Sequence, residues 1–151
     1  MSYLKQHPIQ NSWITDKVDK AMVEYAEQFA EYLAEEKKAK EKKDVVVALT
    51  ASQLRKFFGS VKALQLKTEA LGYQEAEFVM LKAKLAYAEG RVRQKNNGKQ
   101  LRIADFREVM DEAINVVDNS SDRKKSFANF INFFEAIVAY HKVYGKDNDK
   151  Q

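Results

Sequence analysis

The chain has 151 residues, with five glycines, one proline and no cysteine, and hydrophobic residues make up 45% of it. So few glycines and prolines argue against a protein of many strands, whose turns need them, and the lack of cysteine excludes disulfides, thiolate metal sites and cysteine nucleophiles. The formal net charge is +4, but residues 82–107 combine eight cations with two carboxylates, a local excess that suits either a polyanion-binding face or an ordinary solvated surface.

The N-terminal third is predicted to contain an arm, one helix and a charged linker. Residues 1–14 contain Pro8 and several polar groups, and we expect them to form a loosely attached arm. Residues 1–11 lack the apolar stretch of a signal peptide, so we expect a cytoplasmic protein. Apolar side chains then recur at spacings of three and four over residues 15–33, which predicts an amphipathic helix. Residues 35–44 mix lysines with acids, a pattern more typical of a solvated linker than of a polybasic binding segment. We assign residues 1–47 to this arm, helix and linker.

The second predicted helix begins at a capping box. Thr50 is the expected N-cap, and Gln53 lies three residues later, where its side chain can bond back to the backbone. Apolar side chains continue at helical spacing as far as Leu64. Gly72 is expected to end the helix.

Three more helices are predicted in the C-terminal half. The first spans about 73–89, with Gly90 as its expected end, and a loop with an Asn-Gly turn follows at 94–100. The next has an apolar stripe over 103–117. The last, over about 122–144, is the most apolar and is therefore expected at the centre of the fold.

These elements predict an all-α protein, a compact bundle of about five amphipathic helices. We expect residues 48–145 to form its helical core and residues 146–151 to form a flexible tail. No apolar run approaches the roughly 18 residues of a membrane span, so no membrane contact is expected. The helix faces carry more aromatic residues than one small bundle must bury, which indicates a surface for a partner or a second copy.

Enzymatic residue patterns are scarce. The only histidines, His7 and His141, are far too distant in sequence for a zinc-binding spacing, and no phosphate-binding loop or nucleophile elbow is present. We therefore expect no catalytic residue, no metal and no cofactor, although scattered carboxylates keep a helical enzyme as a third hypothesis. His141 falls on the apolar stripe of the last helix, which favours a core or interface histidine over an RNA contact.

Helical spacing groups some of the basic residues. Lys84, Tyr87 and Arg91 lie at i, i+3 and i+7, so they share a stripe that is separate from the apolar one. Cations on such a stripe neutralise phosphates, and an aromatic side chain between them can stack on a base. The alternative is that Tyr87 packs between helices and that the cations are simply solvated.

Three segments resemble a known family. They are Thr-Ala-Ser-Gln-Leu-Arg-Lys-Phe-Phe at 50–58, Leu-Lys-Ala-Lys-Leu-Ala-Tyr-Ala-Glu-Gly-Arg at 81–91 and Phe-Phe-Glu-Ala-Ile-Val-Ala-Tyr-His-Lys at 133–142. In this order they resemble the small subunit of the type III-A CRISPR–Cas interference complex, the Csm complex. The resemblance covers roughly residues 48–144 and leaves residues 1–47 unmatched.

The resemblance implies a non-catalytic subunit in an antiviral, RNA-guided complex. Several copies would stack along the guide RNA–target RNA duplex, touching each other, a backbone subunit and a large signalling subunit. Basic helix faces would contact target-RNA phosphates and read shape and charge, because base pairing supplies the sequence recognition. Motif positions together with charge and helix face nominate eight RNA-binding residues: Arg55, Lys56, Lys62, Lys84, Tyr87, Arg91, Arg93 and Lys142.

These candidates are not of equal rank. Arg55, Lys56, Lys84 and Arg91 are the first choice as phosphate contacts, because motif and helix face both support them. Arg102 and Arg107 add to the local positive field but are close in sequence to Asp105 and Asp111, with which they can pair. The main alternative is a helical protein–protein adaptor that does not bind nucleic acid, favoured by the aromatic-rich helix faces.

Overall fold

The apolar periodicity produces five long helices in the computed structural model, which describes residues 2–145. They are α3 (Lys20–Ala34), α4 (Ala51–Leu71), α5 (Glu75–Lys95), α6 (Arg102–Asp118) and α7 (Arg123–Tyr144). Two single-turn helices precede them, α1 (Tyr3–Gln6) and α2 (Ser12–Thr15). Helices account for 74% of the structure, so the predicted all-α bundle is confirmed.

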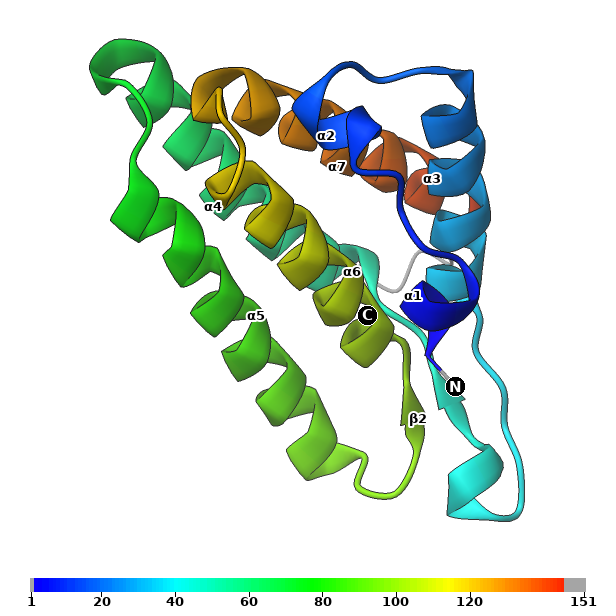
Figure 1. Cartoon of the computed structure of the whole chain (residues 1–151). Helices are drawn as coiled ribbons and strands as arrows, with labels where there is room; N and C mark the ends of the chain where they lie inside the picture. Colours follow the sequence, from blue (N-terminus) through cyan, green and yellow to red (C-terminus); the bar gives the residue numbers. More distant parts are fainter. Residues whose placement is uncertain (1, 146–151) are drawn as a thin grey trace.

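Helix α7 is the central element, as its apolar sequence predicted. It packs most extensively against α3 and also contacts α2, α4 and α6 (Figure 1). Phe130 and Phe134, both fully buried, bring aromatic rings from α7 onto α5 and α4: Phe130 lies 5.4 Å from Phe78 and Phe134 lies 5.3 Å from Phe57, between ring centroids. Edge contacts of this kind add about 0.5–1.5 kcal/mol per pair to the area buried.

The N-terminal segment is not a loose arm, so that prediction is wrong. Tyr3, Trp13 and Ile14 are all buried, and the side-chain amide of Asn129 on α7 donates to the carbonyl oxygen of Ile14 at 2.9 Å. The sequence concealed this because the three buried residues have no regular spacing among polar neighbours. The following helix also starts later than expected, at Lys20, where the Asp19 side chain caps it.

The predicted ends of α4 are confirmed, but the predicted end of α5 is wrong. Thr50 and Gln53 form the reciprocal capping box at 3.1 and 2.9 Å, and Gly72 ends α4 at a positive φ of 89°. Gly90, in contrast, lies inside α5, which continues to Lys95. A glycine in a helix interior costs only about 1 kcal/mol relative to alanine, and the good helix formers around it outweigh that cost.

A short pair of strands joins two loops that are far apart in sequence. Strand β1 (Val46–Val47) pairs in parallel with β2 (Gln100–Leu101), and Val46 also bridges back to Lys37. The charged segment between Lys37 and Val46 ends in a 3-10 turn, Lys42–Asp44. This turn lies at one end of the bundle, beside the connection from α5 to β2 (Figure 1). The predicted linker is thus fastened to the fold, whereas the predicted tail, residues 146–151, lies outside the described residues.

Candidate nucleic-acid interface

A groove runs between the N-terminal half of α4 and the C-terminal half of α5. Its volume is about 730 Å³, and its floor includes the apolar side chains of Leu85 and Ile103. A second hollow of about 720 Å³ follows along the same helix pair, and Lys56 and Lys84 line both. These two lysines therefore lie where the hollows meet.

The larger groove has a cationic lining without a carboxylate. Four basic side chains line it, and no aspartate or glutamate does: Lys56, Lys84, Arg91 and Lys95. All four are exposed, and cations that line a concave surface without carboxylates attract an anionic ligand. The groove is therefore the strongest candidate on this molecule for binding a polyanion.

The stripe predicted on α5 is exposed as expected. Tyr87 has 69% of its surface accessible, so the alternative in which it packs between helices is wrong. The Arg91 guanidinium lies 6.0 Å from the centroid of the Tyr87 ring, which leaves most of that ring available. The neighbouring Leu81 and Leu85 point the other way and are buried. One face of α5 thus serves the core and another presents two cations and an aromatic ring to solvent.

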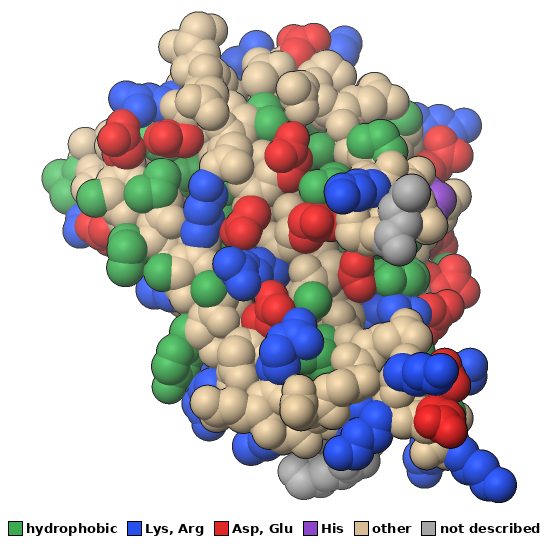
Figure 2. Space-filling model, turned by 60° about the horizontal axis from the view of Figure 1, so that its bottom comes forward, with side chains coloured by type: hydrophobic (Ala, Val, Ile, Leu, Met, Phe, Trp, Pro, Cys, Tyr) green, Lys and Arg blue, Asp and Glu red, His purple; other side chains and the backbone are tan. Residues whose placement is uncertain are grey.

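The cations of α5 lie on two sides of that helix. On the side next to α6, Glu89 accepts from Arg93 at 2.7 Å and from Arg107 at 3.3 Å, and Arg107 also lies 3.5 Å from Asp111. Burial raises the pKa of Asp111 despite that arginine. In Figure 2, acidic and basic side chains are interleaved over the middle of the visible face. Only the groove side of α5 presents its cations without such acids.

The remaining nominated residues lie apart from the groove or have partners. Lys62 forms a 3.0 Å ion pair with Glu135 between α4 and α7 and lies 5.6 Å from the Phe58 ring. Lys142 is exposed in the last turn of α7. Arg55 is exposed on α4, next to Lys56. The structure thus unites Lys56, Lys84, Tyr87 and Arg91, and it does not bring the others into the groove.

Two basic residues considered in the sequence belong to the interior instead. His141 is 2% exposed, and its Nε2 lies 2.8 Å from the carbonyl oxygen of Leu49, which confirms a core histidine. Arg102 is 9% exposed; it donates to the Tyr32 carbonyl at 3.0 Å and to Glu35 at 2.9 Å rather than pairing with Asp105.

Sequence reasoning missed Lys95, which lines the groove with Arg91. The two are four residues apart and therefore lie on the same side of α5. The matching motif ends at Arg91, and extending the stripe by one more turn of the helix finds Lys95.

No helix within residues 2–145 is long and apolar enough to cross a membrane. In the same part of the chain, no group of three or more histidine, aspartate or glutamate side chains is placed to hold a metal ion.

Comparison with known proteins gives one match. The family model described as Csm2 Type III-A matches residues 16–147. The match therefore includes α3, which the sequence resemblance had left outside. Neither the curated proteins nor the solved structures contain a significant match.

Proposed function

The chain belongs to the Csm2 Type III-A family, the small subunit of the type III-A CRISPR–Cas complex, and we propose that it binds the phosphates of target RNA there without catalysing a reaction. The observation that carries this proposal is the carboxylate-free cationic lining of the α4–α5 groove. An RNA-guided complex must hold a guide RNA–target RNA duplex, whose backbone is a regular array of negative charge. The groove has the complementary charge.

Each first-rank residue has a defined role in this proposal. Lys56 and Lys84, on opposing helices, contact phosphates of one strand from both sides of the groove. Arg91 extends the contact along α5, and Arg55, which is exposed next to Lys56 on α4, adds a further cation. Tyr87 offers its exposed ring to a base, an interaction worth about 1–3 kcal/mol. Lys62, Arg93 and Lys142 keep a secondary role, since the first two already have acidic partners and the third lies apart.

The partners follow from membership of a multi-subunit complex. Other subunits of the Csm complex are implied by the family; we assign contacts to its backbone subunit, its large signalling subunit and further copies of this chain, in the cytoplasm and in antiviral defence. Copies of one chain that stack along a duplex must use a different surface on each side of the contact. Leu66, Leu71 and Met80, which are 70%, 69% and 55% exposed near the α4–α5 turn, suit one such surface.

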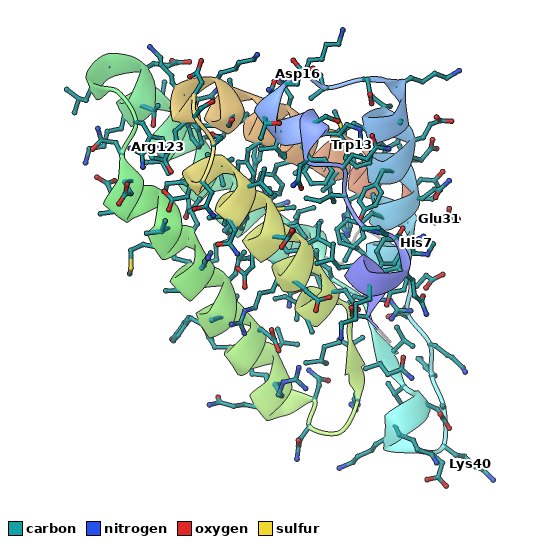
Figure 3. All side chains as sticks on the ribbon, viewed as in Figure 1. His7, Trp13, Asp16, Glu31, Lys40 and Arg123 are labelled. Carbon is teal, nitrogen blue, oxygen red and sulfur yellow. The ribbon has the colours of Figure 1, made fainter. Side chains whose placement is uncertain are left out.

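The test compares two double charge reversals in the reconstituted complex. Lys84→Glu with Arg91→Glu alters the groove, and Lys17→Glu with Lys20→Glu is the matched control with the same change in charge. Both control residues are exposed, and Lys17 directly follows Asp16, which lies at the end of the molecule opposite Lys40 (Figure 3). Target-RNA loading is measured by filter binding at several salt concentrations, with assembly followed by size-exclusion chromatography.

We expect the groove variant to load target RNA at least tenfold more weakly in low salt, because two phosphate contacts become repulsive. The control variant should load RNA as the unaltered protein does. Equal loading by both variants at every salt concentration would overturn the RNA-binding proposal.

An adaptor without nucleic acid is the second candidate, and the same exposed Leu66, Leu71 and Met80 favour it. In that case Leu71→Ser with Met80→Ser would abolish assembly, whereas the groove reversal would change neither assembly nor RNA content. If both variants impair the complex, RNA binding and subunit contact use separate surfaces of this chain.

A further inference from the structure

Two lysine-rich segments, 58 residues apart from start to start, meet at one end of the fold. Residues 37–43 contain five lysines and one glutamate, and residues 95–99 contain two lysines and no acid. We call these two segments together the basic lobe. All its lysines except Lys99, which is half-buried, are exposed.

Backbone contacts hold the two segments together. The Gln100 N–H donates to the Val45 carbonyl at 2.9 Å, and the Gln100 side chain donates to the Lys43 carbonyl at 2.9 Å. Gly98 lies directly against Lys42, since a Cβ placed on this glycine would be 3.8 Å from the Cβ and Cδ of the lysine. The two segments of the lobe are therefore held in a fixed arrangement by direct contacts and are not independent loops.

The lobe continues the cationic stripe of α5. At 100° per residue, Lys84, Arg91 and Lys95 lie within roughly 40° of one another around the helix axis, and all three line the groove. Lys95 is also the last residue of α5 and the first of the lobe's second segment. A chain of phosphates that follows the stripe toward the end of α5 therefore reaches the lysines of residues 37–43.

Nearby acids offset only part of this charge. Glu35, which precedes the lobe, is paired with Arg102 at 2.9 Å and so is directed toward the α3–α6 contact. Glu41 lies within the lobe, and Glu36 and Asp44 flank residues 37–43, so seven lysines stand against these three carboxylates. The mixed charge that made this segment resemble a linker in sequence thus becomes a net positive surface in three dimensions.

We propose that the basic lobe is a second phosphate-binding site, which contacts the same RNA strand as the α5 stripe and lengthens its footprint. This inference rests on the proposed function, because it takes RNA as the ligand of the stripe. It adds a site formed by the β1–β2 pairing, with Lys42 and Lys43 as its main contacts and RNA phosphodiesters as its ligand.

The first experiment measures binding of the full-length protein to a fluorescein-labelled 30-nucleotide single-stranded RNA by anisotropy, from 0.05 to 0.4 M salt. The test variant is Lys42→Gln with Lys43→Gln, which removes charge but keeps the stem that packs near Gly98. Lys17→Gln with Lys20→Gln is the control, and circular dichroism verifies that each variant is folded. Each lost phosphate contact with a single strand lowers the slope of log K against log salt by about 0.7.

We expect the test variant to lower the magnitude of that slope by about 1.4 and to weaken binding about 25-fold at 0.1 M salt, with the control unchanged. If Lys84→Glu with Arg91→Glu weakens binding but the lobe variant behaves as the control does, the lobe proposal is overturned while the proposed function stands. If neither variant weakens binding, both fail.

A second experiment identifies the strand in the assembled complex. Lys40, which projects from the far end of the lobe (Figure 3), is replaced by a photocrosslinking amino acid, and either the guide or the target RNA is end-labelled. A crosslink to the target RNA supports the proposal, whereas a crosslink to the guide RNA alone would overturn the claim that the lobe and the α5 stripe share one strand. A crosslink only to another protein subunit would overturn it.

Discussion

Arg102 offers the clearest test of how the charged segment is fastened to the bundle. It follows β2 directly and reaches across to the end of α3, where its guanidinium carbon lies 3.8 Å from the Tyr32 ring centroid. It donates to the backbone carbonyl of Tyr32 at 3.0 Å, to its hydroxyl at 3.0 Å and to Glu35 at 2.9 Å. Replacing Arg102 by alanine removes these three hydrogen bonds and the contact of the guanidinium with the ring.

The expected loss of stability is about 3 kcal/mol. The exposed Glu35 partner contributes at most about 1 kcal/mol, because its side chain is 54% accessible and its charge is screened. The stacking of the cation on the ring adds about 1 kcal/mol. The bond to the Tyr32 carbonyl adds about 1–2 kcal/mol, because that acceptor loses its charged donor. For a chain of this size the total corresponds to a fall in Tm of about 6–12 °C.

The assay is thermal and urea unfolding followed by circular dichroism, with Arg93→Ala as the matched control. Arg93 also forms an ion pair with a glutamate, Glu89, but its side chain is 48% exposed and the pair spans a single turn of α5. Its loss should therefore cost about 0.5 kcal/mol or less. The reasoning is refuted if Arg102→Ala is no more destabilising than Arg93→Ala.

Three further outcomes are expected. Tyr87→Ala should leave Tm unchanged, because the ring is 69% exposed, and should weaken binding of the labelled RNA by about 1–3 kcal/mol in an anisotropy titration; unchanged binding would remove the stacking role. Gly90→Ala should stabilise α5 by about 0.5–1 kcal/mol, since a Cβ at this position meets nothing within 4 Å. Gly72→Ala should destabilise the end of α4, because the φ angle of Gly72 is 89°. Urea unfolding of the two variants tests these opposite effects. Burial, and next the charge and hydrogen bond of Asp105, raise the pKa of Tyr32 from 10.0 to about 12. The contribution of the neutral phenol to stability is therefore complete below about pH 10 and is lost as the pH rises through about 12. Unfolding measured from pH 9 to 12 should show this loss of stability, and the Tyr32→Phe variant should lack it.

Local sequence determined the helices and most of their ends. The apolar spacing of three and four set which face of each helix is buried, and Thr50 with Gln53 set the start of α4 through contacts only three residues apart. The same periodicity placed Lys84, Tyr87 and Arg91 on the exposed face of α5. Such features depend on neighbours along one helix, so they can be read without knowing the fold.

Other features depended on residues distant in sequence. The burial of Trp13 and Ile14 is produced by α7, more than a hundred residues later, and the pairing of Glu89 with Arg107 requires α5 and α6 to be adjacent. The i,i+4 spacing indicates the pairs of Arg93 with Glu89 and of Arg107 with Asp111. It does not show that Glu89 also binds Arg107 from the next helix, or that Lys84, Arg91 and Lys95 line a groove, because both depend on how the helices pack.

The charged segment shows this division most clearly. Its sequence determined the number of lysines and predicted a solvated surface, and the lysines are indeed exposed. Its position was decided by two residue pairs of the parallel β1–β2 ladder, Val46 with Gln100 and Val47 with Leu101. Because a strand pair forms between partners at any separation along the chain, composition and periodicity carry no record of it, and only the tertiary structure brings residues 37–43 against the end of α5.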